Sequence, residues 1–355
     1  MMRVSVALFA LATTGPLAFL VFACLWGGPW AWAALATMTL APALLDILVP
    51  WAAPSGSADD PDQAEFPAAD LLLATLAIGV LIILPLMVRV IAAPESLGLG
   101  SRIALFLAGG LWFGQVAHPA AHELIHRPGR LLYSLGVAVY SVLLFGHHAS
   151  SHRLMHHRHV ATPSDPNSAL AGEGFYRFLW RAWPQSLRAG LAAERALRAG
   201  KAATPYRIYT GLAAAGLGLG WWLAGLPGLL VWLAFGLHFG AQVLLSDYVQ
   251  HYGLTRAKVG AAAVAGAAVS GRIEAVGQTH SWNAPHWFSS ALMLNAPRHS
   301  DHHVHPQRPF PALRLDDAAP LLPWPLPVAC LVALVPPLWR RRMKPLLARH
   351  AIAKV

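Results

Sequence analysis

The sequence predicts an all-α protein: a transmembrane bundle of six helices that carries a histidine-rich cap. Hydrophobic residues make up 56% of the 355 positions and charged residues only 12%, whereas a soluble domain carries about 25% charged residues. Six apolar runs have about the 20-residue length that crosses a bilayer. Nine of the 18 histidines form short clusters at or just beyond the ends of apolar runs.

The predicted spans are 4–26, 29–49, 70–92, 101–121, 206–225 and 228–248. The first is too long for an ordinary signal-peptide core, and no cleavage signal interrupts it, so we interpret it as a retained anchor. The cap comprises 122–205 and 249–355, and the chain, 1–355, forms a single domain. The Pro-, Ser- and Asp-rich linker 52–68 is expected to be a cytoplasmic loop. The segment 323–339, broken by five prolines, is expected to lie on the bilayer surface.

The clustered histidines are the candidate metal ligands, because neutral imidazole is the commonest biological metal ligand. They are His122, His126, His152, His156, His157, His251, His299, His302 and His303. Spacings of three and four residues place side chains on one helical face, where they can share an ion. Nine ligands exceed the four of a tetrahedral zinc ion. They suit two ions with four or five nitrogens each, and imidazole suits iron, copper and zinc alike.

A seventh apolar stretch, 131–147, decides whether these clusters can meet. If it crossed the bilayer, His126 and His152 would lie on opposite sides and could not share a site. At about 17 residues it is at the lower limit for spanning, so we predict a re-entrant or interfacial helix. With six spans and the N-terminus inside, every cluster then reaches the cytoplasmic side.

Four acids are predicted to orient the ligands, since ligating histidines normally donate their other N–H to a carboxylate or carbonyl. They are Glu123, Asp165, Asp247 and Asp301, and Asp247 lies one helical turn before His251. The nine remaining histidines are expected to play other parts. His238 should face the bundle interior. Nothing in the sequence indicates a function for His350. The others should hydrogen-bond nearby groups: His118, His147, His148, His159, His280, His286 and His305.

The basic charge is concentrated beside the clusters, with ten Lys or Arg against four acids in residues 122–206. By the positive-inside rule this segment is cytoplasmic. No nucleic-acid motif accompanies the charge, so nucleic acid is not an expected partner. Cys24 and Cys330 form no paired CxxC set of the kind that holds iron, so redox chemistry needs electrons from another protein.

Five segments in order resemble the membrane alkane 1-monooxygenases, within the histidine-rich fatty acid desaturase and hydroxylase superfamily. They are HELIHR (122–127), HRLMHH followed by VATPSDPNSA (152–169), DYVQHYGL (247–254), THSWNAPH (279–286) and RHSDHH (298–303), and a PPLWRR stretch (336–341) follows. Ser151 stands where the family usually has Glu, Asp247 replaces Asn, and Gln250 replaces Glu. None of these departures removes a histidine.

The resemblance implies an enzyme of the bacterial inner membrane with a cytoplasmic, non-haem di-iron site on the nine histidines. It implies O2-dependent terminal hydroxylation of medium- or long-chain alkanes to 1-alkanols, with electrons from rubredoxin and rubredoxin reductase. The hydrophobic substrate is expected to reach the site through a channel open to membrane lipid. Candidate lining residues are Trp112, Phe113, Leu124, Trp232 and Phe235.

Several other functions compete with this interpretation. A fatty acyl desaturase uses similar histidine clusters, and a hydroxylase of alkyl-aromatic compounds, terpenes or other lipids would use the same site. A zinc protease with Glu123 as base fits HELIH but leaves seven clustered histidines unexplained. A metal transporter would place histidines along a path within the spans, whereas these cluster at the cytoplasmic ends.

Overall fold

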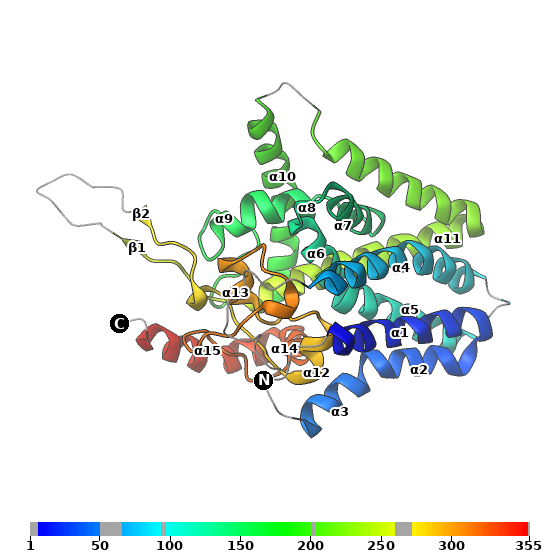
Figure 1. Ribbon diagram of the computed structural model, residues 1–355, viewed down its shortest axis with the longest axis horizontal. Helices are drawn as coiled ribbons and strands as arrows, with labels where there is room; N and C mark the ends of the chain where they lie inside the picture. The colour runs from blue at the N-terminus through cyan, green and yellow to red at the C-terminus, as the bar shows by residue number, and fades with distance from the viewer. Residues whose placement is uncertain are drawn as a thin grey trace, which may run out of the picture.

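A computed structural model of the chain describes residues 6–49, 66–93, 95, 97–199, 203–259 and 272–353, and its secondary structure is almost entirely helical, with one short strand pair (Figure 1). The antiparallel strands are β1 (Lys258–Val259) and β2 (Arg272–Ile273). The helices are α1 (Val6–Trp26), α2 (Gly28–Met38), α3 (Leu40–Leu48), α4 (Pro67–Ala92), α5 (Leu99–Trp112), η1 (Phe113–Ala117), α6 (His118–His126), α7 (Arg130–Val142), α8 (His148–Ser151), η2 (His152–His156), α9 (His157–His159), α10 (Phe175–Arg198), α11 (Tyr206–His251), η3 (Gln278–His280), α12 (Trp287–Leu292), α13 (His299–Val304), η4 (Phe310–Ala312), α14 (Leu326–Ala333) and α15 (Pro336–Ala353).

Within the described residues, five helical stretches are long and apolar enough to cross a membrane: Val6–Trp26, Gly28–Leu48, Ala68–Ala92, Leu99–His126 and Tyr206–His251. The last, α11, contains 46 residues and is interrupted by non-helical dihedral angles at Ala224 and Gly225. The interruption coincides with the predicted boundary between 206–225 and 228–248. The five stretches therefore make six passes through the bundle, as the sequence predicted.

Close packing of glycines forms the hairpin in α11. Gly225 has a φ of +59°, a left-handed conformation that favours glycine. A Cβ atom at Gly228 would overlap the Gly220 carbonyl oxygen, and Trp232 packs over Gly216 and Gly220. The two halves of α11 can approach this closely only because side chains are missing at the contact.

Polar contacts at the helix ends show that successive passes alternate in direction. At one end, the Asp46 carboxylate of α3 accepts hydrogen bonds from backbone N–H groups at the start of α12. At the same end, Asp70 near the start of α4 pairs with Arg127, just after α6, at 2.8 Å. At the opposite end, Arg102 of α5 donates to the Ile91 carbonyl of α4. The start of α4 and the end of α6 therefore lie together, at the opposite end of α4 from its contact with α5.

The fourth span and the segment that follows it differ in length from the prediction. The fourth span was predicted as 101–121, but its helix continues to His126 through η1. At 1.5 Å per residue its 28 residues measure about 42 Å, more than the ~30 Å hydrocarbon core. Its histidine-bearing end can thus project beyond the core. The stretch 131–147 yields only the 13-residue α7, and the linker 52–68 lies almost wholly outside the described residues.

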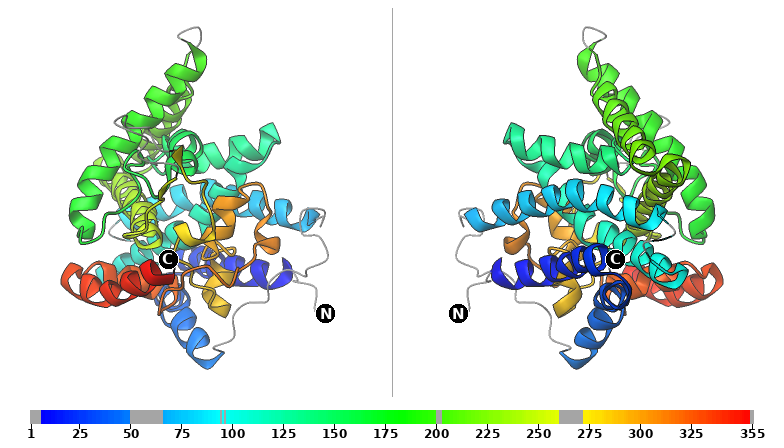
Figure 2. Two further views of the ribbon diagram at one scale, coloured as in Figure 1. Left: turned by 90° about the vertical axis from the view of Figure 1, so that its left-hand side faces the viewer. Right: turned by 90° about the vertical axis from the view of Figure 1, so that its right-hand side faces the viewer.

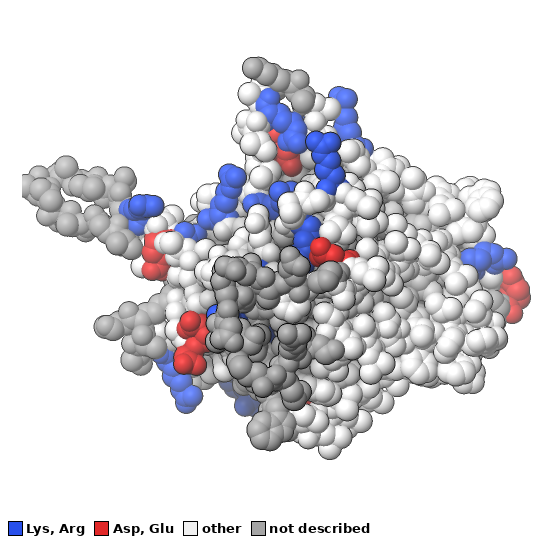
Figure 3. All heavy atoms as spheres, viewed as in Figure 1, with Lys and Arg blue, Asp and Glu red and all other residues white. Residues whose placement is uncertain are grey.

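Charge separates the two ends of the bundle. In the face seen in Figure 3, most Lys, Arg, Asp and Glu gather toward the end that carries α9, α10 and the strands, whereas the opposite part is white apart from one small charged group at its right-hand edge. Figure 2 looks along the bundle from its two ends and shows α10 and the first half of α11 on one side, with α3 projecting on the other. The uncharged surface and long apolar helices are those of an integral membrane protein.

Substitution of Gly228 by Ala should open the α11 hairpin, because its new Cβ atom overlaps the Gly220 carbonyl. We expect overpacking to cost about 1–3 kcal/mol and to lower the thermal denaturation midpoint of the detergent-purified protein. Gly218→Ala is the matched control, since nothing lies within 4 Å of a Cβ atom there. Equal midpoints for the two variants would contradict this account of the hairpin.

Candidate metal centre

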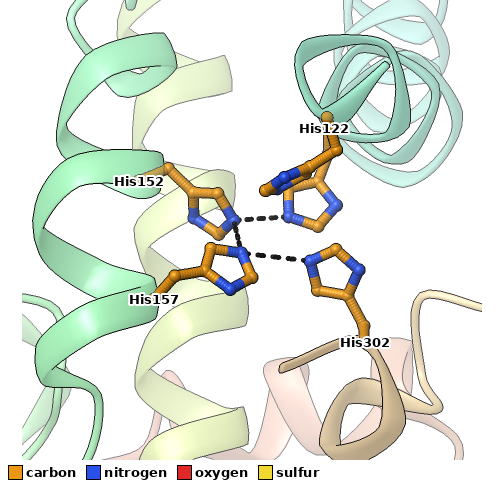
Figure 4. A group of neighbouring side chains, drawn as sticks. His122, His152, His157 and His302 are labelled. Atoms are coloured by element: carbon orange, nitrogen blue, oxygen red, sulfur yellow. Dashed lines mark hydrogen bonds between the residues drawn. The ribbon is translucent and has the colours of Figure 1, made fainter. Parts of the chain in front are cut away.

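Five of the nine predicted histidines form a first group, with one ligand nitrogen from each lying within 4.8 Å of the others: His122, His126, His152, His157 and His302. The Nε2 atom of His152 lies 2.6 Å from that of His122 and 2.8 Å from that of His157, and the latter lies 3.2 Å from that of His302 (Figure 4). Helix α6, the η2–α9 segment and α13 supply these side chains. Helix α13 is far from the other two segments in the sequence.

The other four histidines form a second group of the same compactness: His156, His251, His299 and His303. The Nε2 atom of His299 lies 3.0 Å from that of His251 and 3.1 Å from that of His303. The His156 ring centroid lies 4.7 Å from that of His251. All four side chains are buried. The structure therefore brings together all nine histidines that the sequence singled out, in sets of five and four.

A π-helical turn directs His152, His156 and His157 into two different groups. The backbone N–H of His157 donates to the carbonyl of His152, five residues back, as in a π-helix. This turn aligns residues five apart, so His152 and His157 serve the first group while His156 turns to the second. The sequence had predicted that His152 and His156 share one ion through ordinary four-residue spacing. That pairing is wrong because the turn is not α-helical.

Burial keeps most of these imidazoles neutral. It lowers the pKa of His157 to about 3 and, together with neighbouring histidines, lowers the pKa of His302 and His303 well below the ordinary value. A neutral imidazole has a nitrogen lone pair available for a metal. Most of the clustered side chains are thus in the protonation state that ligation requires.

His156 is held in one orientation by Asp165. The Asp165 carboxylate accepts from His156 Nδ1 at 2.8 Å and from the Ser168 hydroxyl at 2.7 Å. Burial lowers the pKa of His156, but the Asp165 charge more than offsets this effect, so the net shift is upward. The proton sits on Nδ1, toward the carboxylate. The opposite nitrogen, Nε2, is buried without a hydrogen-bond partner among the described residues.

The donor set fits a pair of metal ions. Buried Nε2 atoms of His126 and His156 have no hydrogen-bond partner in the described part of the chain, and such atoms carry a free-energy cost unless something binds them. The other facing nitrogens approach mainly one another. Five and four imidazole nitrogens could therefore hold one ion each, although imidazole by itself does not select iron, copper or zinc.

The other predicted orienting acids have different partners. Glu123 contacts Arg127 at 3.3 Å and accepts from the Phe310 backbone N–H. Asp301 accepts two hydrogen bonds from Arg308, at 2.6 and 2.7 Å, and fixes the loop that follows α13.

Asp247 does not orient His251 as predicted. It accepts from Asn167 Nδ2 at 2.6 Å, while His251 Nδ1 lies 3.4 Å from the His280 carbonyl oxygen. The sequence did not single out Asn167 or the His280 carbonyl. A backbone acceptor leaves no signal in residue identity, and Asn167 lies eighty positions from Asp247.

Several of the remaining histidines hydrogen-bond neighbours as expected. A ring nitrogen of His118 lies 2.9 Å from the Tyr140 hydroxyl. Ring nitrogens of two others lie near carboxylates, with His280 2.8 Å from Glu274 and His305 3.0 Å from Asp301. His148 differs: its ring stacks on His152, and its buried Nε2 has no partner among the described residues.

An apolar cavity of about 360 Å³ lies between helices of the bundle. Its apolar walls come chiefly from α2, α3, α11 and α14 and include Met38, Pro42, Leu111, Leu245, Met293 and Leu331. This volume is within the ~300–1,000 Å³ range of small-molecule sites. None of the predicted channel residues lines it. Trp232 lines a smaller cavity of about 180 Å³, and the other four are fully buried in the core.

Comparison with known proteins agrees with this fold and site. The family model described as fatty acid desaturase matches residues 99–325. Alkane 1-monooxygenase 1 of Pseudomonas aeruginosa is 33% identical over 72% of this chain and 66% of its own length. The alkane 1-monooxygenase of Ectopseudomonas oleovorans is 35% identical over 68% of this chain and 59% of its own length.

A more distant relative is the xylene/toluene monooxygenase hydroxylase component of Pseudomonas putida, 27% identical over 62% of this chain and 58% of its own length. The alignments thus span less than two thirds of each relative. Membrane helices that end in two histidine groups define a membrane protein with a candidate two-metal centre. The chain belongs to the fatty acid desaturase family, and it is similar in particular to the alkane 1-monooxygenases.

Substitution of Asp165 by Asn should weaken metal retention, because His156 loses the carboxylate that orients its ring. Loss of such a partner typically costs 10–100-fold in metal affinity. Metal content per chain, measured after dialysis against graded chelator concentrations, checks this expectation. Asp317→Asn, on the exposed surface, is the control, and identical retention in both variants would refute the orienting role.

Proposed function

We propose that this chain is a membrane-bound alkane 1-monooxygenase that carries two iron ions. The observation that carries the proposal is the convergence of nine histidines into groups of five and four. The names of the similar relatives give the same reaction. In this proposal, His122, His126, His152, His157 and His302 hold one ion, and His156, His251, His299 and His303 hold the other.

Iron is proposed because of the reaction. An iron pair, when bound, supplies with O2 an oxidant that can break an unactivated C–H bond, a step beyond ordinary side chains. The chain's own residues position this chemistry. Asp165 keeps His156 in one orientation, and the burial of both groups keeps bulk water away from them.

The apolar cavity is the proposed substrate site. An alkane offers no polar handle, so its binding depends on burial, at about 0.8 kcal/mol per methylene. Ser246 on the cavity wall lies five residues before His251, which corresponds to about 8 Å along a helix. The exposed side chain of Leu331, on α14, lines the same cavity. A chain could therefore pass from lipid toward the histidines.

Electrons are proposed to come from a rubredoxin, which a rubredoxin reductase would reduce. The free cysteines, Cys24 and Cys330, offer no iron-binding set, so the chain needs a separate electron carrier. The excess of arginine near the histidine end would attract an acidic carrier and anionic lipid. By the positive-inside rule, the same excess supports a proposed orientation with the metal site and the N-terminus on the cytoplasmic side of a bacterial inner membrane.

The proposed reaction is tested with octane, O2, rubredoxin and rubredoxin reductase. We expect 1-octanol from the unaltered protein and at least a 100-fold lower rate from His157→Ala and His303→Ala, which remove one ligand from each group. His159→Ala is the control, because His159 belongs to neither group. No 1-octanol from iron-loaded protein, or full activity in both ligand variants, would refute the proposal.

Two other reactions use the same site and share the assay. The family description favours an acyl desaturase, which would convert a fatty acyl substrate to an alkene. The xylene/toluene relative favours hydroxylation of an alkyl-aromatic methyl group. Product analysis with a fatty acyl substrate and with p-xylene distinguishes these alternatives from terminal alkane hydroxylation.

A further inference from the structure

One wall of the apolar cavity is polar. His238, Gln242 and Ser246 recur every four residues on α11 and thus form a stripe along one helical face, and Gln115 of η1 lines the same cavity. These residues lie within the stretches assigned to the membrane. Polar side chains are rare in such segments and usually serve a function.

Two of these side chains lack internal partners. The Gln115 Oε1 atom is buried and has no hydrogen-bond partner among the described residues. His238 makes an edge contact with the Phe106 ring, at 5.8 Å between centroids, and no hydrogen bond within the described part of the chain. Gln242 and Ser246, by contrast, donate to the Gly110 carbonyl at 2.6 Å and to Gln250 at 2.8 Å.

An alkane would leave the free groups unsatisfied. A buried amide without a partner costs about 1–3 kcal/mol, and the hydrocarbon core offers little water to replace it. A cavity that held only alkanes would be more stable with leucine or phenylalanine at these positions. Gln115 and His238 therefore point to a ligand with a polar group of its own.

We infer that this cavity binds a hydrocarbon chain that carries one uncharged hydroxyl group. The hydroxyl can donate to Gln115 Oε1 and accept from the His238 ring N–H, while the chain occupies the apolar walls. A carboxylate does not suit the site. Asp46 is the only charged residue among the described lining residues, it is acidic, and it already accepts from the start of α12.

This inference rests on the proposed function for the source of the alcohol. The alcohol is either the product of alkane hydroxylation or a substrate with a second reactive end. In the second case, one terminal C–H bond is replaced by a C–O bond. The alcohol, O2, two protons and two electrons from the reduced donor together give a diol and water. Both sources present the same hydroxyl group to the cavity.

Binding of tritiated 1-dodecanol to the protein in lipid nanodiscs tests the inference without turnover. Unlabelled 1-dodecanol should compete about 3–10-fold better than dodecane, as one or two hydrogen bonds predict. Gln115→Leu and His238→Phe should each remove most of this preference and leave dodecane competition unchanged. Gln185→Leu on the exposed face of α10, outside the cavity, is the matched control.

The outcomes separate this inference from the proposed function. Equal competition by alcohol and alkane, or a preference that survives in both cavity variants, overturns the hydroxyl site even if octane is hydroxylated. A selective loss in either variant supports the site even if octane is not hydroxylated. Incubation of 1-dodecanol with O2 and reduced donor then identifies the source, since 1,12-dodecanediol marks a substrate and its absence marks a product site.

Discussion

The structure depends on the convergence of nine imidazoles, seven of them buried, at one end of a membrane bundle. Burial removes the proton from most of them, and it also removes the water that would satisfy their nitrogens. Facing nitrogens within 2.6–3.2 Å of one another cannot all be satisfied by hydrogen bonds among themselves, since a neutral ring has one donor. An ion in each group resolves this conflict.

The rest of the fold holds the four contributing segments at that end. Arg127 ties the end of α6 to Asp70 at the start of α4. Arg308 binds Asp301 on α13, and the Asn283 side chain donates to the Ser300 hydroxyl on the same helix. The hairpin in α11 returns the chain so that His251 arrives beside α13. Each of these contacts either joins segments that are distant in the sequence or lies beside a histidine of the metal site.

Much of this arrangement could be predicted from sequence, because apolar runs and histidine spacing are local signals. All nine histidines, the six passes and an orienting role for Asp165 were predicted, although the sequence did not indicate that His156 is its partner. The π-helical turn at His152 was not predicted, because the histidine spacing there is equally compatible with an α-helix. Asp247 pairs with Asn167 instead of His251, since tertiary contacts decide which of several nearby groups accepts. Aromatic residues predicted to line a channel proved to be core. Of the polar stripe on α11, only His238 was predicted to face the interior, because the cavity surface that it shares with Gln242 and Ser246 is formed by the fold.

X-ray absorption at the iron edge of the purified, iron-loaded protein tests the central claim most directly. Two ions in separate histidine groups predict close to two irons per chain, each surrounded by four or five imidazole nitrogens and no sulfur. A single metal ion per chain, or iron bound mainly by non-imidazole ligands, would contradict the account.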